Sequence, residues 1–309
     1  MKKIEYIFFQ FFKWIVLALP LKSAQRLGYY LGGLAYFVVG RRRKVALNNL
    51  QHAFPEKSER ERKRIAKGAF RNFGISFVEL LWFPNLTDQT VRKLVRLQNP
   101  EIMIEAHKKG RGMVMLAGHF GNWELTALAV AHLTGIPVTI IVQSQSNELV
   151  DEVINRHRCL FGNKVVPMGL AVREIIRTLQ SGETIAIAPD QSGPMEGPFV
   201  EFFGRRVASH QGPAVFALRS GAPIQMGFMM RQNDGTYEVV LEEIPVSDIA
   251  AYNEENVMEL TRRHSAVLEK HVRMFPDHWL WMHRRWKHTW ESVQREKAKS
   301  MQQPSETRA

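Results

Sequence analysis

Residues 112–142 of this chain, GMVMLAGHFGNWELTALAVAHLTGIPVTIIV, place two short apolar runs on either side of a segment with helical spacing. The first run covers residues 112–117 and the second covers residues 138–142, and a Gly-Ile-Pro turn ends the segment between them. Strands separated by a helix of this length are typical of a parallel α/β sheet, because a parallel connection needs a crossover. The stretch predicts a strand, a helix over residues 122–134 and a second strand.

The same alternation continues along most of the chain. It predicts helices near residues 149–160, 171–180, 212–219 and 252–274, and strands at residues 165–166, 184–188, 223–230 and 236–244. Residues 42–97 are instead highly charged and have helical spacing, with Pro55 and Pro84 as breaks. We therefore expect an α/β fold with a mainly parallel central sheet flanked by helices.

The N-terminal forty residues are unusually apolar. Residues 6–21 and 27–39 carry almost no charge, yet neither run reaches the ~20 residues of a comfortable membrane span. Three interpretations remain: an interfacial anchor, a single short span, or ordinary core helices. Aromatic residues beside lysines favour the membrane interface, and the basic cluster at residues 41–44 places the body of the protein on the cytoplasmic side. We expect a hydrophobic, membrane-anchoring helical segment at the N-terminus.

The composition indicates a folded protein with an anionic partner. The 309 residues are 45% hydrophobic and 23% charged, which excludes a wholly disordered chain. The formal net charge is +12, and nucleic acid, an acidic membrane, a phosphorylated substrate or an acidic protein would each match it. Cys159 is the only cysteine, so the chain can form neither an intrachain disulfide nor a cysteine-based zinc cage.

His119 and Glu124 are the sharpest candidates for catalysis. They follow a predicted strand and open a predicted helix, at the carboxyl edge where open α/β sheets bind ligands. Asn122 is a good N-cap, and Glu124 falls in the first turn, so a loop histidine can bend back to it. We expect His119 to act as a general base with Glu124 as its partner. The alternative is that His119 is an ordinary turn residue.

The same H-x4-E spacing recurs at His264 and Glu269, inside a predicted continuous helix. Side chains five residues apart on a helix diverge by about 140°, so this second pair cannot face each other. The spacing alone is therefore a weak signal, and only the strand–loop–helix context distinguishes His119 from His264 as a candidate.

Other candidates lie further along the chain. Asp190 and Gln191 follow the predicted strand at residues 184–188, on the same sheet edge as His119, where they either touch substrate or form a turn. Arg158 either contacts an oxyanion or phosphate or is a solvated helix arginine. Arg205 lies after two phenylalanines, in a loop near a lipid or in a hairpin with a solvated tip. Residues 279–287 interleave aromatic and basic side chains, which favours a membrane interface over a nucleic-acid platform.

Four blocks of sequence together resemble one enzyme family. They are HFGNWE (119–124), DQSGPMEGPFVEFFGRR (190–206), RRRKVALNNLQHAFPEKSERER (41–62) and PDHWLWMHRRWK (276–287). In this order they are similar to the bacterial lipid A biosynthesis acyltransferases, the late lauroyl and myristoyl transferases of the lysophospholipid acyltransferase superfamily. Glu124, where the glycerolipid branch usually has Asp, and the absence of an FPEG block point to the lipid A branch.

The resemblance implies an enzyme on the cytoplasmic face of the bacterial inner membrane. Such an enzyme moves a fatty acyl group from acyl carrier protein to a hydroxyl of a phosphorylated lipid A precursor, without a metal, a cofactor or nucleic acid. It implies His119 as general base, Glu124 as its partner, and substrate contacts from Asn122, Arg158, Asp190, Gln191 and Arg205. The expected domains are a membrane anchor (1–45), an acyltransferase domain (46–296) and a disordered tail (297–309).

Three rival functions remain open at this point. The first is the same chemistry on another glycolipid or an aminolipid, since residues 143–146 read QSQS where many family members carry an arginine-containing stretch. The second is a non-catalytic basic protein that binds membranes or RNA. The third is a metal hydrolase that uses His119, Asp190 and His210.

Overall fold

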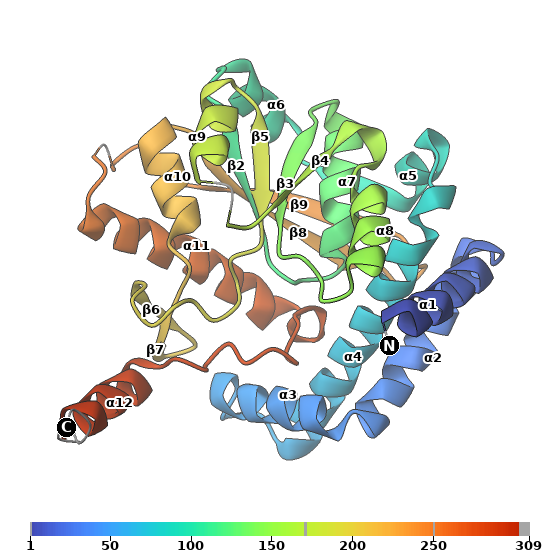
Figure 1. Ribbon diagram of the computed structural model, residues 1–309, viewed down its shortest axis with the longest axis horizontal. Helices are drawn as coiled ribbons and strands as arrows, with labels where there is room; N and C mark the ends of the chain where they lie inside the picture. The colour runs from blue at the N-terminus through green and yellow to red at the C-terminus, as the bar shows by residue number, and fades with distance from the viewer. Residues whose placement is uncertain (1, 170–171, 250, 303–309) are drawn as a thin grey trace, which may run out of the picture.

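The central sheet has seven strands in the order β1-β9-β8-β2-β5-β3-β4 (Figure 1). The computed structural model describes residues 2–169, 172–249 and 251–302. The strands are β1 (Val95–Gln98), β2 (Met113–Ala117), β3 (Val138–Val142), β4 (Lys164–Pro167), β5 (Thr184–Ile187), β8 (Ile224–Arg231) and β9 (Tyr237–Ile244). All neighbours pair in parallel except β8 and β9, which are antiparallel. The predicted α/β fold with a mainly parallel sheet is confirmed.

Helices cover both faces of this sheet. In β2, Met113 and Met115 belong to the apolar cluster that includes α7 (Trp123–Thr134), whereas Val114 and Leu116 belong to the cluster that includes α9 (Val172–Gln180), α10 (Gly212–Ser220) and α11 (Glu254–Met274). Side chains of a strand alternate between faces, so a strand buried on both sides is a continuous apolar run. This explains why the run at residues 112–117 carries no polar alternation.

The ends of α7 follow local sequence signals. Asn122 caps its N-terminus by accepting a hydrogen bond from Leu125 N at 3.0 Å, and Gly135 ends it in the left-handed conformation at φ 71°. Both residues suit these positions, because a side-chain acceptor satisfies a free helix N–H and glycine adopts positive φ without strain. The predicted helix over residues 122–134 is confirmed to within one residue.

Four helices make up most of residues 2–82: α1 (Lys2–Leu17), α2 (Leu21–Val38), α3 (Gly40–Ala53) and α4 (Glu59–Trp82). Figure 1 shows them gathered at one end of the molecule, with α2 alongside α4. The two helices approach so closely that a Cβ built on Gly32 would lie 2.2 Å from Phe70 O. The expected domain boundary at residue 45 falls inside α3. Within the residues that the structure describes, no helix is long and apolar enough to cross a membrane.

The remaining elements join these layers. They are α5 (Asp88–Leu94), α6 (Glu101–Lys108), α8 (Glu148–Arg158), the antiparallel hairpin β6 (Phe199–Phe202) and β7 (Arg205–Ala208), α12 (Trp290–Gln302), and short 3₁₀ helices at Phe83–Asn85, Leu160–Gly162 and Pro276–His278. Helix α12 continues through residues 297–302, and residues 303–309 lie outside the described residues, so the expected disordered tail at 297–309 stays a prediction. Strand β1 lies in a stretch expected to be helical, and its pairing with β9 across the sheet edge decides its conformation.

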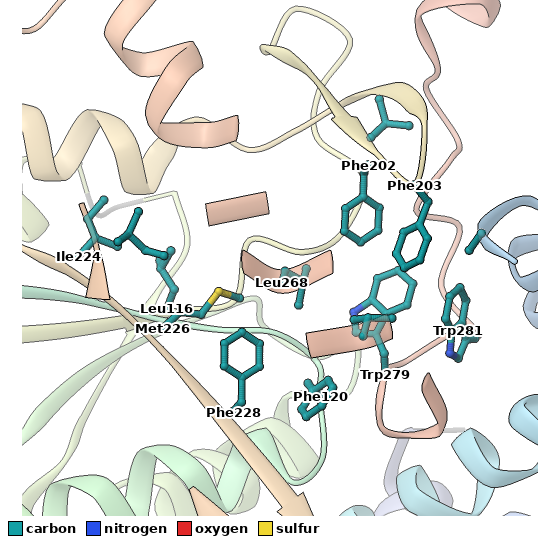
Figure 2. Packing of buried hydrophobic residues seen from close by; sticks show 14 of the residues in the cluster. Leu116, Phe120, Phe202, Phe203, Ile224, Met226, Phe228, Leu268, Trp279 and Trp281 are labelled. Carbon is teal, nitrogen blue, oxygen red and sulfur yellow. The ribbon is translucent and has the colours of Figure 1, made fainter. Parts of the chain in front are cut away.

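The aromatic block at residues 279–287 is a core segment. Trp279 and Trp281 are 3% and 0% exposed, and Figure 2 shows them beside Phe202 and Phe203 of the hairpin. Arg285 is also buried and donates to Ala208 O and Ser209 Oγ. The expectation that this block forms a membrane interface is therefore wrong for Trp279 and Trp281. Aromatic residues that alternate with cations suit a wet interface and a buried cluster equally, and only the packing partners separate the two.

Candidate active site

The loop at residues 118–122 joins the carboxyl end of β2 to α7. Its sharp turn depends on Gly121, which has φ +57° and approaches β8 so closely that a Cβ there would lie 1.8 Å from Met229 O. Gly121 N also donates to His278 O at 2.8 Å. Because β2 and β5 are parallel neighbours, the loop lies beside the segment that leaves β5. The prediction that Asp190 and Gln191 lie on the same sheet edge as His119 is confirmed.

Asp190 holds His119 by two hydrogen bonds. The backbone N–H of His119 donates to Asp190 Oδ2 at 2.8 Å, and the ring Nδ1 lies 2.7 Å from Asp190 Oδ1. Trp279 Nε1 donates to the same Oδ2 at 2.9 Å. The Asp190 side chain is 3% exposed and the His119 side chain 20%. A buried carboxylate thus fixes the ring, whose Nε2 lies 3.4 Å from Gln191 Nε2.

The electrostatics of this pair suit a general base. Burial alone would lower the pKa of His119, but the charge and hydrogen bond of Asp190 outweigh burial and raise it. Burial alone would raise the pKa of Asp190, but the charge and hydrogen bonds of His119, with the Trp279 bond, lower it to about 2. An ionised Asp190 favours the proton on Nδ1, which leaves the Nε2 lone pair of the neutral ring free to accept a proton.

Glu124 does not pair with His119 by a hydrogen bond, which corrects the sequence-based expectation. Its carboxylate binds Arg158 of α8 in bidentate fashion, with Nε to Oε2 at 2.8 Å and Nη2 to Oε1 at 2.5 Å. The guanidinium of Arg158 matches both carboxylate oxygens at once, whereas one ring nitrogen would leave one of them free. Glu124 still acts on His119 through space, because after burial and Asp190 its charge also raises the pKa of His119.

Arg158 is not a solvated helix arginine. Its side chain is 11% exposed, and Nη1 donates to Asn155 Oδ1 at 3.0 Å. Arg156, two residues away, is 64% exposed and pairs with Glu152 of its own helix. The two arginines therefore face different environments, as their spacing predicts.

The other predicted substrate contacts fall in three different places. Gln191 lies beside the His119 ring. Asn122 is fully buried, and both its amide atoms bond within the protein, to Leu125 N and to Glu79. Arg205 is exposed at the tip of the β6–β7 hairpin, as one of the two interpretations predicts. The structure brings Asp190, Gln191, Glu124 and Arg158 around His119.

Two residues of the site were missed in the sequence. Trp279 donates a hydrogen bond to the Asp190 carboxylate but belongs to a block whose composition favoured a membrane interface. Glu79 of α4 accepts a hydrogen bond from Asn122, the last residue of the loop, and in the sequence it is one of many charges in a helical segment. Neither residue has a local sequence signal, because each meets its partner through tertiary packing alone.

An apolar cavity of about 160 Å³ opens beside the segment that leads to Asp190. Pro189 and His210 line it together with large apolar side chains of Ile141, Met168, Val172, Ile175, Ile187 and Phe216. Across residues 2–169, 172–249 and 251–302, no three His, Cys, Asp or Glu side chains are grouped to hold a metal ion. Those described residues therefore contain no such cluster for the metal-hydrolase alternative.

Comparison with known proteins identifies one matching family and several relatives. The family model for bacterial lipid A biosynthesis acyltransferases matches residues 2–288, which include every residue of the site described above. The chain is 28% identical over 280 residues to the lipid A biosynthesis palmitoleoyltransferase of Escherichia coli (strain K12), covering 89% of this chain and 88% of that protein. It is 28% identical over 279 residues to the lauroyltransferase of the same strain, with coverages of 89% and 88%. The myristoyltransferase of that strain is 25% identical over 259 residues, with coverages of 83% and 77%.

Proposed function

The chain belongs to the bacterial lipid A biosynthesis acyltransferase family, and on that premise we propose that it moves a fatty acyl group from acyl carrier protein to a hydroxyl of a lipid A precursor, with His119 as general base. The observation that carries the mechanism is the His119–Asp190 pair, 2.7 Å apart at the carboxyl edge of the sheet. Acyl transfer in lipid A biosynthesis follows from the family. The donor, the acceptor hydroxyl and the catalytic roles are the proposal.

The reaction begins when the acceptor hydroxyl approaches Nε2 of His119. Nε2 takes the hydroxyl proton as the oxygen attacks the thioester carbonyl, and Asp190 balances the charge of the imidazolium. The tetrahedral oxyanion then collapses and breaks the C–S bond. The leaving thiolate recovers the proton from the imidazolium, so the products are an ester and a free thiol on the carrier protein.

Glu124 and Arg158 supply the fixed charges near this reaction. The charge of Arg158 acts on His119 in the direction opposite to that of Glu124. Held by Glu124, the guanidinium can bind an anionic group such as the oxyanion or an acceptor phosphate. Gln191, beside the ring, supplies a polar contact to substrate. The apolar cavity next to Asp190 suits the acyl chain, since it is lined mainly by aliphatic and aromatic carbon.

A donor comparison with purified protein tests this function. We expect a lipid A precursor to gain one acyl chain, measured by mass spectrometry, when the full chain is supplied with acyl carrier protein loaded with a fatty acid. The formal charge of +12 suits an acidic carrier, so raising the salt concentration should lower kcat/KM and leave kcat nearly unchanged. Acyl-coenzyme A and acyl-pantetheine should be poorer donors. An unchanged lipid mass would remove lipid A as acceptor, and equal rates with all three donors would remove the carrier protein as partner.

We further propose that α1 and α2 lie on the cytoplasmic face of the bacterial inner membrane. Ile4, Ile7, Phe8, Phe11 and Trp14 of α1 follow helical spacing and are each 59% or more exposed. On α2, Phe37 is 58% exposed, and Lys67 of α4 lies over its ring, 5.1 Å from the centroid. Exposed apolar side chains with cations beside them are the pattern of helices in the interface of an anionic bilayer.

Substituting serine for Phe8, Phe11 and Trp14 together should release the protein from vesicles that contain anionic phospholipid. Each fully buried side chain of this kind contributes about 1.5–3 kcal/mol, so the vesicle partition constant should fall at least about a hundredfold in a sedimentation assay. The matched control substitutes serine for Met258 and Met274 of α11, which are 47% and 51% exposed but lie outside α1 and α2. The control should bind the vesicles as the wild type does. Equal partitioning of the triple variant and the wild type would refute this membrane face.

A further inference from the structure

A row of polar side chains on α4 contacts the loop at residues 118–122, which carries His119. Asn72, Ser76 and Glu79 are four and three residues apart, so they share one face of the helix. Their bonds to the site are Asn72 Nδ2 to Asp277 O at 2.8 Å, Ser76 Oγ to Gly121 O at 3.1 Å, and Asn122 Nδ2 to Glu79 Oε2 at 2.7 Å. Ser76 Oγ also lies 3.0 Å from Asn72 O one turn back, so its single proton is shared between the helix carbonyl and the loop carbonyl. The row therefore touches the loop at its last two residues and supports the segment that carries Trp279.

Glu79 is the centre of this arrangement. Its side chain is 2% exposed and accepts hydrogen bonds from four different elements. The donors are Gln25 of α2 at 2.8 Å, Asn122 at 2.7 Å, Arg231 at the end of β8 at 3.2 and 3.3 Å, and Tyr237 at the start of β9. A buried carboxylate is tolerable only when it is paired and fully bonded. Its position is thus determined by all four elements at once.

The loop is held from two sides. Asp190 binds His119 at its start, whereas α4 binds Gly121 and Asn122 at its end. Asn122 also caps α7, whose first turn carries Glu124. A shift of the loop end by a fraction of an ångström would therefore turn the His119 ring relative to Asp190.

We propose that Ser76 and Glu79 are positioning residues, which hold the loop at residues 118–122 so that His119 stays bonded to Asp190. This inference rests on the proposed role of His119 in acyl transfer. Neither residue touches the reacting atoms, so their effect passes through Gly121 and Asn122. Loosening them should lengthen the His119–Asp190 bond, weaken the alignment of Nε2 and move the pKa of His119 back towards its ordinary value.

Ser76→Ala and Glu79→Gln test the proposal. We expect kcat to fall roughly ten- to hundredfold, with KM for both substrates within about twofold, because a misplaced catalytic group costs rate rather than binding. The acid limb of the pH–kcat profile should move to lower pH. The charges that act on the pKa of His119 are those of Asp190, Glu124 and Arg158, and the charge of His119 in turn lowers the pKa of His283. Neither substitution alters any of these groups.

Thr261→Val is the matched control for Ser76→Ala. Thr261 is fully buried on α11, and its hydroxyl bonds only Val257 O one turn back, at 2.7 Å. It should lower the melting temperature about as much as Ser76→Ala while leaving kcat and the pH profile unchanged. Glu79→Gln leaves Arg231 without its counter-charge and can fail to fold. Ser76→Ala removes no charge, so this variant alone still tests the positioning role.

The outcomes separate this inference from the function on which it rests. If the wild type transfers acyl chains and Ser76→Ala matches it in kcat and pH profile, the α4 row is merely structural and the inference is overturned. If the wild type transfers nothing to a lipid A precursor, the proposed function fails instead. A lowered kcat with a shifted acid limb, absent from Thr261→Val, supports the positioning role.

Discussion

We expect His119→Ala to lower kcat of acyl transfer by about 10²- to 10⁴-fold, the range typical of removing a general base. The variant keeps its fold, because the ring lies in a loop while β2 and α7 on either side are held by their own apolar contacts. Membrane binding should also be unchanged, since α1 and α2 do not contain the substitution. The measurement is a transfer assay at saturating donor and acceptor, with circular dichroism as the check on folding.

His132→Ala provides the matched control. His132 Nε2 lies 2.8 Å from Asp88 Oδ1, almost the distance of the His119–Asp190 pair, but it sits at the far end of α7 and its Asp88 partner is 61% exposed. Loss of this second His–Asp pair should leave kcat unchanged. A folded His119→Ala enzyme that keeps most of its activity would contradict the mechanism.

Asp190→Asn should reduce kcat by about 10²- to 10⁴-fold as well, although it changes only one atom type. An amide can present its NH₂ group to Nδ1, which favours the wrong tautomer and cannot balance the imidazolium charge. Glu124→Gln is the comparison, and its effect should be smaller because Glu124 acts on His119 through space. Comparable losses from the two variants would assign the partner role to both carboxylates.

The pH dependence of kcat gives a second test of the His119–Asp190 pair, with a predicted direction of change. The general base must be neutral, so activity rises with pH through the His119 pKa, which burial opposes but Asp190 raises above the ordinary value of 6.5. Asp190→Asn removes the raising charge, and the acid limb should therefore move to lower pH. An acid limb in the same place for wild type and Asp190→Asn would show that a different group limits the rate.

The same two pKa shifts both stabilise the fold, but their contributions depend on pH in opposite directions. The raised pKa of His119 contributes stability that is fully present below about pH 6.5 and is lost as pH rises through the higher folded value. The pKa of Asp190, lowered from 3.8 to about 2, contributes stability that is present above pH 3.8 and is lost as pH falls towards 2. The pair therefore contributes most between these two limits, and Asp190→Asn should flatten the profile of unfolding free energy against pH.

Several features of this protein follow from the sequence alone. The apolar runs, the Asn122 cap and the Gly135 stop predict strands and helices within a few residues, because each signal acts within its own segment. Strand–helix alternation predicts parallel strands, and parallel strands place His119 and Asp190 at one edge. The four separated blocks were sufficient to indicate the family.

Only the tertiary structure decided which side chains meet. Glu124 stands five residues from His119 in the chain, yet α8 brings Arg158 to it, and the partner of His119 is Asp190, 71 residues away. Trp279 and Trp281 are core residues because the β6–β7 hairpin covers them. Glu79 contacts the loop at residues 118–122 because α4 packs against that loop. Helix and strand propensities depend on the residues of one segment, whereas hydrogen bonds and burial depend on side chains contributed by several segments at once. The pairing of a carboxylate is therefore a property of the packed molecule rather than of its neighbours in sequence.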